Sequence, residues 1–291
     1  MIDQVLPGDV CVAEIWTGDD DATAADRLWP DEERLLAGAG QRRLVEFASG
    51  RRLARQALLA LGITPDAIPI GPDGGPVWPV GVIGSITHCP GYRAAVVARS
   101  GEQVDDMSAK TGAIEAEGRL AGPPLAIGID AEPVGALSQR IVSYIANPSE
   151  IDWLARLKVT QPRLDGDHLL FSIKEAIYKA WRPLTGQPLA FHQATVELGE
   201  MDFSKTTVES EEVPSAQSNH LPLAKTAVEP GEMGHRGASG GNSALITGSF
   251  SFTVEAELAP LLAGIDWRGR WLLADGLIIV GLLGRGSQPA P

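Results

Sequence analysis

Short apolar stretches, two of them flanking a turn signal, occur in the first third of the chain and predict β-strands. One stretch has its apolar core at residues 10–16, within a first strand region that spans residues 1–20. Two more, residues 82–88 and 92–98, flank the turn-forming Cys89-Pro90-Gly91. They predict a β-hairpin that carries His88 at its tip.

Between these strands the apolar period becomes helical. It runs through two stretches from a proline-led, acidic start at Pro30 to Gly62, a suitable C-terminal cap. Residues 171–181 predict a further, buried helix that carries two lysines and a glutamate. An apolar strand at residues 125–132 precedes this helix, and Pro133 closes it.

The C-terminal region returns to strands. One is expected near residues 249–258, and a hairpin pairs residues 270–273 with 277–280 across Asp275-Gly276, a two-residue turn signal. Together with the helices, these strands predict an α+β fold.

Two irregular stretches interrupt the pattern. Residues 100–123 are polar and acidic, and we interpret them as an inserted linker between an N-terminal lobe, 1–123, and a C-terminal lobe, 124–291. Residues from about 204 to 248 are rich in Ser, Glu, Pro and Gly, and predict a flexible insertion in the second lobe.

Composition narrows the class of protein. The 291 residues are 44% hydrophobic and 21% charged, with no apolar run near the ~20 residues of a membrane helix and no signal-like start. The two cysteines favour reduced thiols, and we expect a cytoplasmic protein that does not bind membranes. The net charge of −13 argues against general nucleic-acid binding.

Carboxylates mark the strand at 125–132. Gly128, Asp130 and Glu132 share one face, so the two carboxylates lie ~6–7 Å apart along the strand. Such oxygen ligands favour Mg²⁺, with Mn²⁺ as a substitute. Gly128 would let a ligand approach the backbone. The alternative is that both carboxylates face solvent at the strand end.

The helix at 171–181 places Ser172, Glu175 and Lys179 on one stripe. Glu175 could complete a three-carboxylate metal site, with Lys174 and Lys179 covering phosphate oxygens. An exposed Glu175–Lys179 ion pair is the alternative. Upstream cations offer further phosphate contacts, although each alone also suits a solvated or structural role: Arg43, Arg51 and His88.

The motifs occur together in a recognisable order, at residues 50–58, 78–79, 84–92, 128–133 and 171–181. In this order the chain resembles the 4′-phosphopantetheinyl transferases of the Sfp/EntD type, close to their actinobacterial members. The resemblance covers nearly all of the chain outside the two irregular stretches. It implies two similar lobes about a pseudo-twofold axis, with coenzyme A in the cleft between them.

The resemblance also implies residue roles. The implied magnesium ligands are Asp130, Glu132 and Glu175. The implied coenzyme contacts are Lys174 and Lys179 at the phosphates, Arg43, Arg51 and His88 near the 3′-phosphate, and Ser85 and Thr87 beside the nucleotide. Members of this subgroup often carry a lysine where this chain has Ile70, so we expect weaker coenzyme A binding.

The implied reaction transfers phosphopantetheine from coenzyme A to a serine of an apo acyl or peptidyl carrier protein and releases 3′,5′-ADP. Glu175 is the candidate base, with Lys179 and Asp130 completing the catalytic set. Such carriers present an acidic helix, and residues 137–144 are our candidate for its docking segment. A metal-dependent nucleotide phosphohydrolase and a catalytically silent scaffold that binds coenzyme A or carriers are the alternatives. We expect a monomer; the sequence does not reveal which carriers are served.

Overall fold

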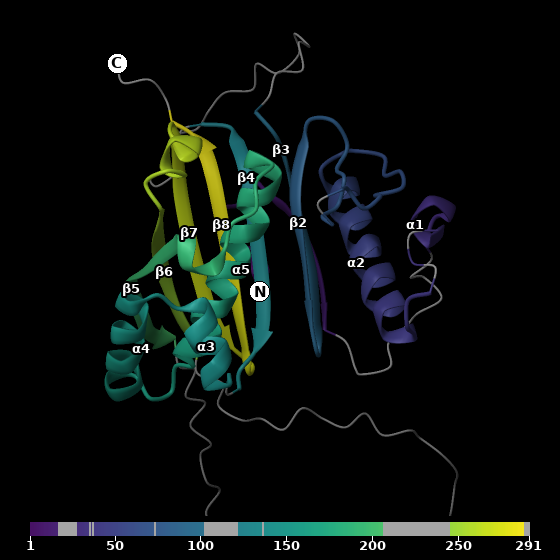
Figure 1. Ribbon diagram of the computed structural model, residues 1–291. Coiled ribbons are helices and arrows are strands. Elements are labelled where there is room, and N and C mark those ends of the chain that lie inside the picture. The colour runs from purple at the N-terminus through teal and green to yellow at the C-terminus, as the bar shows by residue number, and fades with distance from the viewer. Residues whose placement is uncertain are drawn as a thin grey trace, which may run out of the picture.

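The structure is a computed structural model that describes residues 1–16, 28–34, 36, 38–72, 74–101, 122–135, 137–205 and 245–287. Within these ranges the strands form two antiparallel sheets, one of three strands and one of five. Figure 1 shows the two sheets beside each other, with β2 and β4 near their junction. Helices lie on both sides of the pair, which confirms the α+β prediction.

The first sheet has the strand order β1-β3-β2. Its elements in chain order are the 3₁₀ turn η1 (Ile2–Gln4), β1 (Cys11–Trp16), α1 (Pro30–Arg34), α2 (Gln41–Ala60), β2 (Val82–Cys89) and β3 (Tyr92–Arg99). The predicted hairpin is confirmed, with Gly91 at φ +84° in its turn. The 20-residue helix α2 packs on one face of this sheet through Leu53, Ala54, Ala57 and Leu58.

The second sheet has the strand order β4-β8-β7-β6-β5. Its elements are β4 (Pro124–Pro133), α3 (Gln139–Ile145), α4 (Pro148–Thr160), α5 (Gly166–Thr185), the 3₁₀ turn η2 (Phe191–Gln193), β5 (Ala194–Lys205), β6 (Leu245–Val254), the 3₁₀ turn η3 (Ala259–Leu262), β7 (Ile265–Ala274) and β8 (Leu277–Gly286). None of the helices in the described ranges combines the length and apolar character needed to cross a bilayer.

The C-terminal hairpin is confirmed, although its strands are longer than predicted. Asp275 and Gly276 both have positive φ, +50° and +74°, as a tight turn of the I′ type requires. The predicted insertion at 204–248 is too wide, because residues 204–205 end β5 and residues 245–248 begin β6. Its remaining residues, and most of 100–123, lie outside the described residues.

Three apolar clusters explain the layered arrangement. One fills the space between α2 and the first sheet, and another lies between α3, α4, α5 and the second sheet. The third joins the facing sides of the two sheets, with Tyr92 and Val96 of β3 against Ile129 of β4 and Ile279 of β8. The sheets therefore share a core between the two outer helical layers (Figure 1).

Each sheet forms a lobe with the 20-residue helix that packs on it, α2 on the first sheet and α5 on the second. We propose to divide the chain into lobes at 123/124, as the sequence predicted. We expected a ligand to approach the backbone at Gly128, but helix α5 packs there instead. A Cβ at this position would lie 1.8 Å from the carbonyl oxygen of Ala176 on α5. The glycine therefore lets α5 lie close against β4, which positions the helix that carries Glu175.

Candidate active site

Two hydroxyl side chains join the lobes where β2 runs beside β4. Ser85 Oγ accepts a hydrogen bond from the Ile129 N–H, and Thr87 Oγ1 accepts one from the Ala131 N–H, both over 3.1 Å. Both side chains are buried. Because β4 is an edge strand, these hydroxyls take the place of a neighbouring strand. Contact with a nucleotide stays a prediction for Ser85 and Thr87.

Asp130 occupies the centre of this junction and is only 4% exposed. Its Oδ1 accepts from Lys179 Nζ over 2.6 Å and from Thr87 Oγ1 over 3.2 Å, while its Oδ2 accepts from Ser172 Oγ over 2.8 Å. Lys179 Nζ also donates to the Ile129 carbonyl over 3.1 Å. Residues from β2, β4 and α5 therefore fix one carboxylate, and Ser172 and Lys179 reach it from the same stripe of α5. Contact of Lys179 with phosphate oxygens stays a prediction.

Glu132 and Glu175 lie near Asp130 but have no hydrogen-bond donor among the described residues. Both are partly buried. Burial raises the pKa of Glu132 to about 7, and the neighbouring charges of Asp130 and Glu175 contribute. Burial also raises the pKa of Glu175, with Asp130 adding to the shift and Lys179 opposing it. The neighbouring cations, Lys179 for both carboxyls and His168 for Glu132, offset these effects only in part.

The chemistry of this donor set fits a hard divalent cation such as Mg²⁺, because all three groups offer carboxylate oxygens. Their arrangement does not yet match a bound ion. Across the described parts of the chain, no three acidic, histidine or cysteine side chains surround a common point at metal-binding distances. The Lys179 ammonium lies on Asp130 instead. Metal binding by Asp130, Glu132 and Glu175 therefore stays a prediction.

The structure contradicts the prediction that Lys174 covers phosphate oxygens. Its ammonium donates to Glu150 Oε2, to the Ile145 carbonyl and to the Phe191 carbonyl, at 2.6–2.8 Å, and the side chain is 1% exposed. The reason is helical geometry: residues five apart point about 140° from each other, so Lys174 and Lys179 serve different faces of α5. The Asn147–Glu150 spacing is a capping-box signal in the sequence, but it does not reveal this buried ion pair.

A second group of polar residues lies on the α2 side of the first sheet. Arg43 Nη1 lies 3.5 Å from His88 Nε2, and the Arg43 and Arg51 guanidinium groups lie 5.9 and 4.2 Å from the centre of the Phe47 ring. Arg51 Nε donates to the Ile68 carbonyl over 2.8 Å. The structure therefore brings together the three residues that the sequence assigned to one phosphate.

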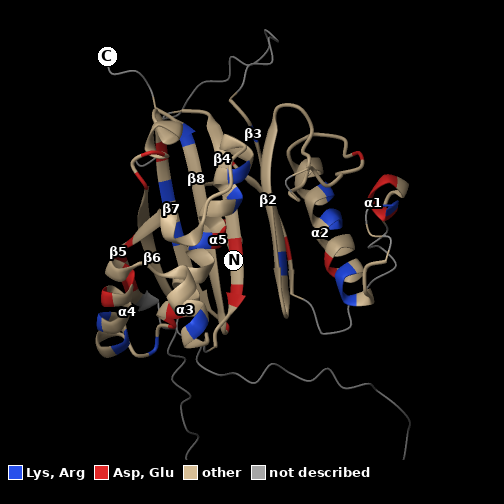
Figure 2. Cartoon of the chain, in the orientation of Figure 1, with Lys and Arg blue, Asp and Glu red and all other residues tan. Residues whose placement is uncertain are grey.

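Positive charge is in excess here. Burial lowers the pKa of Arg51 to about 10; Glu32 opposes this shift, and Arg43 and Arg55 add to it. Burial also lowers the pKa of His88; Lys179, Arg43 and Arg93 lower it further, and Glu46 opposes them. Figure 2 shows basic positions along α2 and acidic positions at the end of β4, so the two groups differ in sign.

Sequence reasoning missed Arg93, which pairs with His88 in the β2–β3 register. This residue is 8% exposed, and its Nε and Nη1 atoms are buried with no hydrogen-bond partner in the described part of the chain. An unpaired buried guanidinium is costly unless an anion approaches it. The arginine lies in an apolar strand pattern that gave no reason to single it out.

A pocket of about 210 Å³ opens beside Glu175. Its walls come from α3, α5, the segment after α5 and the start of β5, and they are Tyr144, Lys174, Glu175, Tyr178, Leu189, Ala190, Phe191 and Ala194. Tyr144 is 72% exposed and its ring meets that of Phe191 edge-on, at 5.8 Å between centroids. Glu175 and the exposed Tyr144 of α3 therefore line the same pocket.

Comparison with known proteins shows the family to which the chain belongs. Residues 31–98 match the 4′-phosphopantetheinyl transferase N-terminal domain, and residues 126–226 match the 4′-phosphopantetheinyl transferase superfamily. The chain is 35% identical to the 4′-phosphopantetheinyl transferase Npt of Nocardia iowensis over 97% of this chain and 99% of the relative.

Two other relatives match shorter parts. The 4′-phosphopantetheinyl transferase PptT of Mycobacterium tuberculosis is 36% identical over 67% of this chain and 76% of the relative. The 4′-phosphopantetheinyl transferase Svp of Streptomyces mobaraensis is 41% identical over 57% of this chain and 59% of the relative. The resemblance inferred from the motifs is thereby confirmed, and the chain belongs to the 4′-phosphopantetheinyl transferase family.

Proposed function

We propose that this enzyme transfers the 4′-phosphopantetheine arm of coenzyme A to a serine of an apo carrier protein, in an Mg²⁺-dependent reaction that releases 3′,5′-ADP. Membership of the transferase family supports the group that is transferred. The observation that carries the residue assignments is the carboxylate of Asp130, held by Thr87 of one lobe and by Ser172 and Lys179 of the other. It places an acidic centre at the junction between the lobes.

The cationic group on the α2 side supplies the nucleotide end of the site. Arg43, Arg51, His88 and Arg93 carry more positive charge than their acidic neighbours offset, and this excess suits the 3′-phosphate of coenzyme A. The arginines present planar donors that match phosphate oxygens, which a lysine would not. We assign the 3′-phosphate to this group.

The acidic centre supplies the metal end. Asp130 retains one unused acceptor position on Oδ2, and Glu132 and Glu175 have no donors among the described residues. These three side chains would hold Mg²⁺, which when bound neutralises charge on the diphosphate. Lys179 adds a positive charge fixed beside Asp130.

Transfer requires a base for the serine of the carrier. The serine oxygen forms a bond to the phosphorus that bears pantetheine, and the bond from that phosphorus to the nucleotide phosphate breaks. The leaving 3′,5′-ADP takes the electron pair, and we assign the serine proton to Glu175. Its raised pKa brings this carboxylate closer to the range in which a base works well near neutral pH.

The pocket beside Glu175 gives the pantetheine arm a place next to the base, and its outer end points to the carrier. On α3, Ile141 and Tyr144 are exposed apolar side chains, and Arg140 is an exposed cation next to them. This combination suits the acidic helix of a carrier despite the net charge of −13. We therefore place carrier docking on α3, within the segment 137–144.

Intact-mass analysis of several apo carriers after incubation with enzyme, coenzyme A and Mg²⁺ tests the proposal. We expect the mass of one phosphopantetheine on the carrier serine and an equal amount of 3′,5′-ADP. Cleavage of coenzyme A without a carrier would support the phosphohydrolase alternative. Binding of coenzyme A without any product, and without a need for Mg²⁺, would support the silent scaffold.

A further inference from the structure

We propose that Lys174 is a positioning residue, whose buried ammonium ties together the walls of the pocket beside Glu175 and so sets the geometry for transfer. It does not bind coenzyme A. This inference rests on the proposed function, because it concerns the same transfer step. It is based on the position of the Lys174 ammonium, which contacts α3, α4 and η2.

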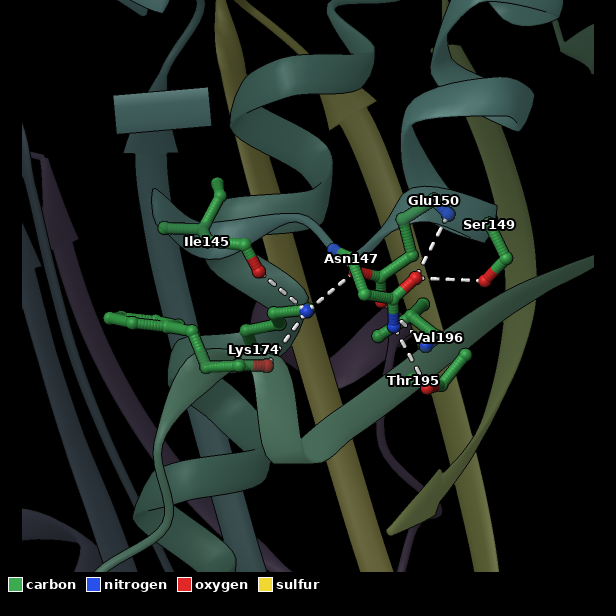
Figure 3. A network of polar contacts seen from close by, with 8 residues as sticks. Ile145, Asn147, Ser149, Glu150, Lys174, Thr195 and Val196 are labelled. Carbon is green, nitrogen blue, oxygen red and sulfur yellow. Dashed lines mark hydrogen bonds and ion pairs between the residues drawn. The ribbon is translucent and has the colours of Figure 1, made fainter. Parts of the chain in front are cut away.

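The ammonium joins three elements to α5. Lys174 Nζ donates to Glu150 Oε2 on α4 over 2.6 Å, to the last carbonyl of α3, at Ile145, over 2.7 Å, and to the Phe191 carbonyl of η2 over 2.8 Å. Figure 3 shows the ammonium between Ile145 and the Asn147–Glu150 turn. An ammonium has three N–H donors, so these acceptors use all of them. No donor remains for a phosphate.

Glu150 extends the connection to β5. Its Oε1 accepts from the Val196 N–H and its Oε2 from the Asn147 N–H, both over 2.8 Å. Asn147 Nδ2 in turn donates to Thr195 Oγ1 over 2.8 Å. The side chains of Lys174 and Glu150 are 1% and 0% exposed, and burial lowers the pKa of Lys174 against the opposing effect of Glu150. Such a pair fixes an arrangement because breaking it leaves a buried charge.

Two of the three acceptors of the Lys174 ammonium lie at the pocket. Ile145 follows Tyr144, and Phe191 and Lys174 are themselves wall residues. The Phe191 ring also lies near Tyr144, at 5.8 Å, and near Phe171 of α5, at 6.1 Å between centroids. Lys174 precedes Glu175 on α5, so the same helical turn holds the walls and carries the proposed base. Loss of the ammonium would let α3 and η2 move relative to Glu175.

The test compares Lys174→Met with the unaltered enzyme, and uses Lys158→Met as a matched control. Lys158 is an exposed lysine of α4 that pairs with Asp167. For Lys174→Met we expect 3′,5′-ADP affinity within about twofold of the unaltered enzyme and kcat lower by about a hundredfold, since small displacements of reacting groups cost that much. We expect Lys158→Met to match the unaltered enzyme in both.

The double variant Lys174→Met/Glu150→Gln separates positioning from stability. It removes the stranded buried charge and keeps a side-chain oxygen for Val196, so its urea midpoint should exceed that of Lys174→Met. Its kcat should stay low because the ties to Ile145 and Phe191 are still missing.

Three results would overturn the inference. They are a loss of 3′,5′-ADP affinity in Lys174→Met of tenfold or more, unchanged kcat in that variant, and recovery of kcat together with the urea midpoint in the double variant. If the unaltered enzyme transfers nothing to any carrier, the proposed function falls and this inference with it. Normal transfer by both the unaltered enzyme and Lys174→Met would remove only the inference.

Discussion

Thr87 Oγ1 donates a hydrogen bond to Asp130 Oδ1 over 3.2 Å and accepts one from the next backbone N–H, at Ala131, over 3.1 Å. A single hydroxyl of the first lobe thus orients the Asp130 carboxylate of the second lobe. It also accepts a hydrogen bond from a backbone N–H of the edge strand β4. Such a contact couples the packing of the lobes to the geometry of the acidic centre.

Thr87→Val keeps the shape of the side chain and removes both hydrogen bonds. We expect a loss of roughly 1–3 kcal/mol in the free energy of unfolding, because the buried Ala131 N–H loses its acceptor. Transfer should fall as well, since Asp130 keeps only Ser172 and Lys179 as partners. Urea unfolding and the rate of carrier modification measure the two effects.

Thr87→Ser is the control for this prediction, because it retains the hydroxyl and should retain most of both properties. If Thr87→Val is as stable and as active as the unaltered enzyme, the hydroxyl does not hold Asp130 in solution.

Crowded carboxylates should make stability depend on pH through Glu132. The pKa of this carboxyl is raised in the folded state, to about 7, so the folded protein binds the proton more tightly than the unfolded chain does. Its stabilising contribution is present below the ordinary glutamate pKa and is lost as the pH rises through about 7. Glu132→Gln should therefore flatten the fall in thermal midpoint between about pH 5 and pH 8.

Mg²⁺ extends this prediction. It should raise the thermal midpoint of the unaltered protein more at pH 8 than at pH 5, because protons and the cation compete for the carboxylates. Glu132→Gln should lose most of this response, whereas the exposed Glu197→Gln on β5 should keep it. An equal Mg²⁺ response in all three proteins would show that Glu132 holds no metal.

Strand β4 shows what a two-residue period in the sequence can predict. Alternation places Asp130 and Glu132 on one face, and the apolar partners Ile127, Ile129 and Ala131 do lie in the shared core between the sheets. The pattern could not give the hydrogen-bond partners of Asp130. The contact from Thr87 crosses between lobes over a sequence separation of 43 residues, so no local period encodes it.

Lys174 shows where sequence reasoning fails. Two lysines in one motif suggest the same role for both, but on a helix Lys174 and Lys179 point in different directions. The partner of Lys174, Glu150, lies 24 residues upstream. Gly128 is a similar case, because the sequence does not show that the Ala176 carbonyl packs against this glycine. Both errors concern packing of α5 against distant elements, and tertiary contacts decide such positions.

Arg93 offers a test of the proposed 3′-phosphate site. Arg93→Met should weaken 3′,5′-ADP binding by about tenfold, or about 1.4 kcal/mol, because one cation beside the phosphate is lost. The same change should leave the urea midpoint unchanged or raise it, since two buried N–H groups without partners disappear. Isothermal titration and urea unfolding provide the two measurements.

Arg99→Met is the matched control, because Arg99 lies on the same strand but is exposed and donates to the Leu61 carbonyl. It should bind 3′,5′-ADP normally. Unchanged affinity in Arg93→Met would place the phosphate away from this side chain.

Glu175→Gln tests the assigned base. The change removes a partly buried carboxylate that has no hydrogen-bond donor among the described residues, so the thermal midpoint should stay level or rise. Carrier modification should fall by about 10²–10⁴-fold, the usual contribution of a positioned base. Affinity for 3′,5′-ADP measured without Mg²⁺ should not change, because the proposed 3′-phosphate contacts lie on α2, β2 and β3. Glu257→Gln, an exposed change outside the site, should leave transfer intact.

The pH dependence of transfer provides an independent readout for Glu175. With Glu175 as base, kcat of the unaltered enzyme should rise with pH through the raised pKa of this carboxyl and then level off, because only the ionised form accepts the serine proton. In Glu175→Gln the residual rate should lose that rise. If Glu175→Gln turns over near normally, the carboxyl has no part in the chemistry. If its rate falls but keeps the rise with pH, Glu175 acts through charge or metal binding and another group accepts the proton.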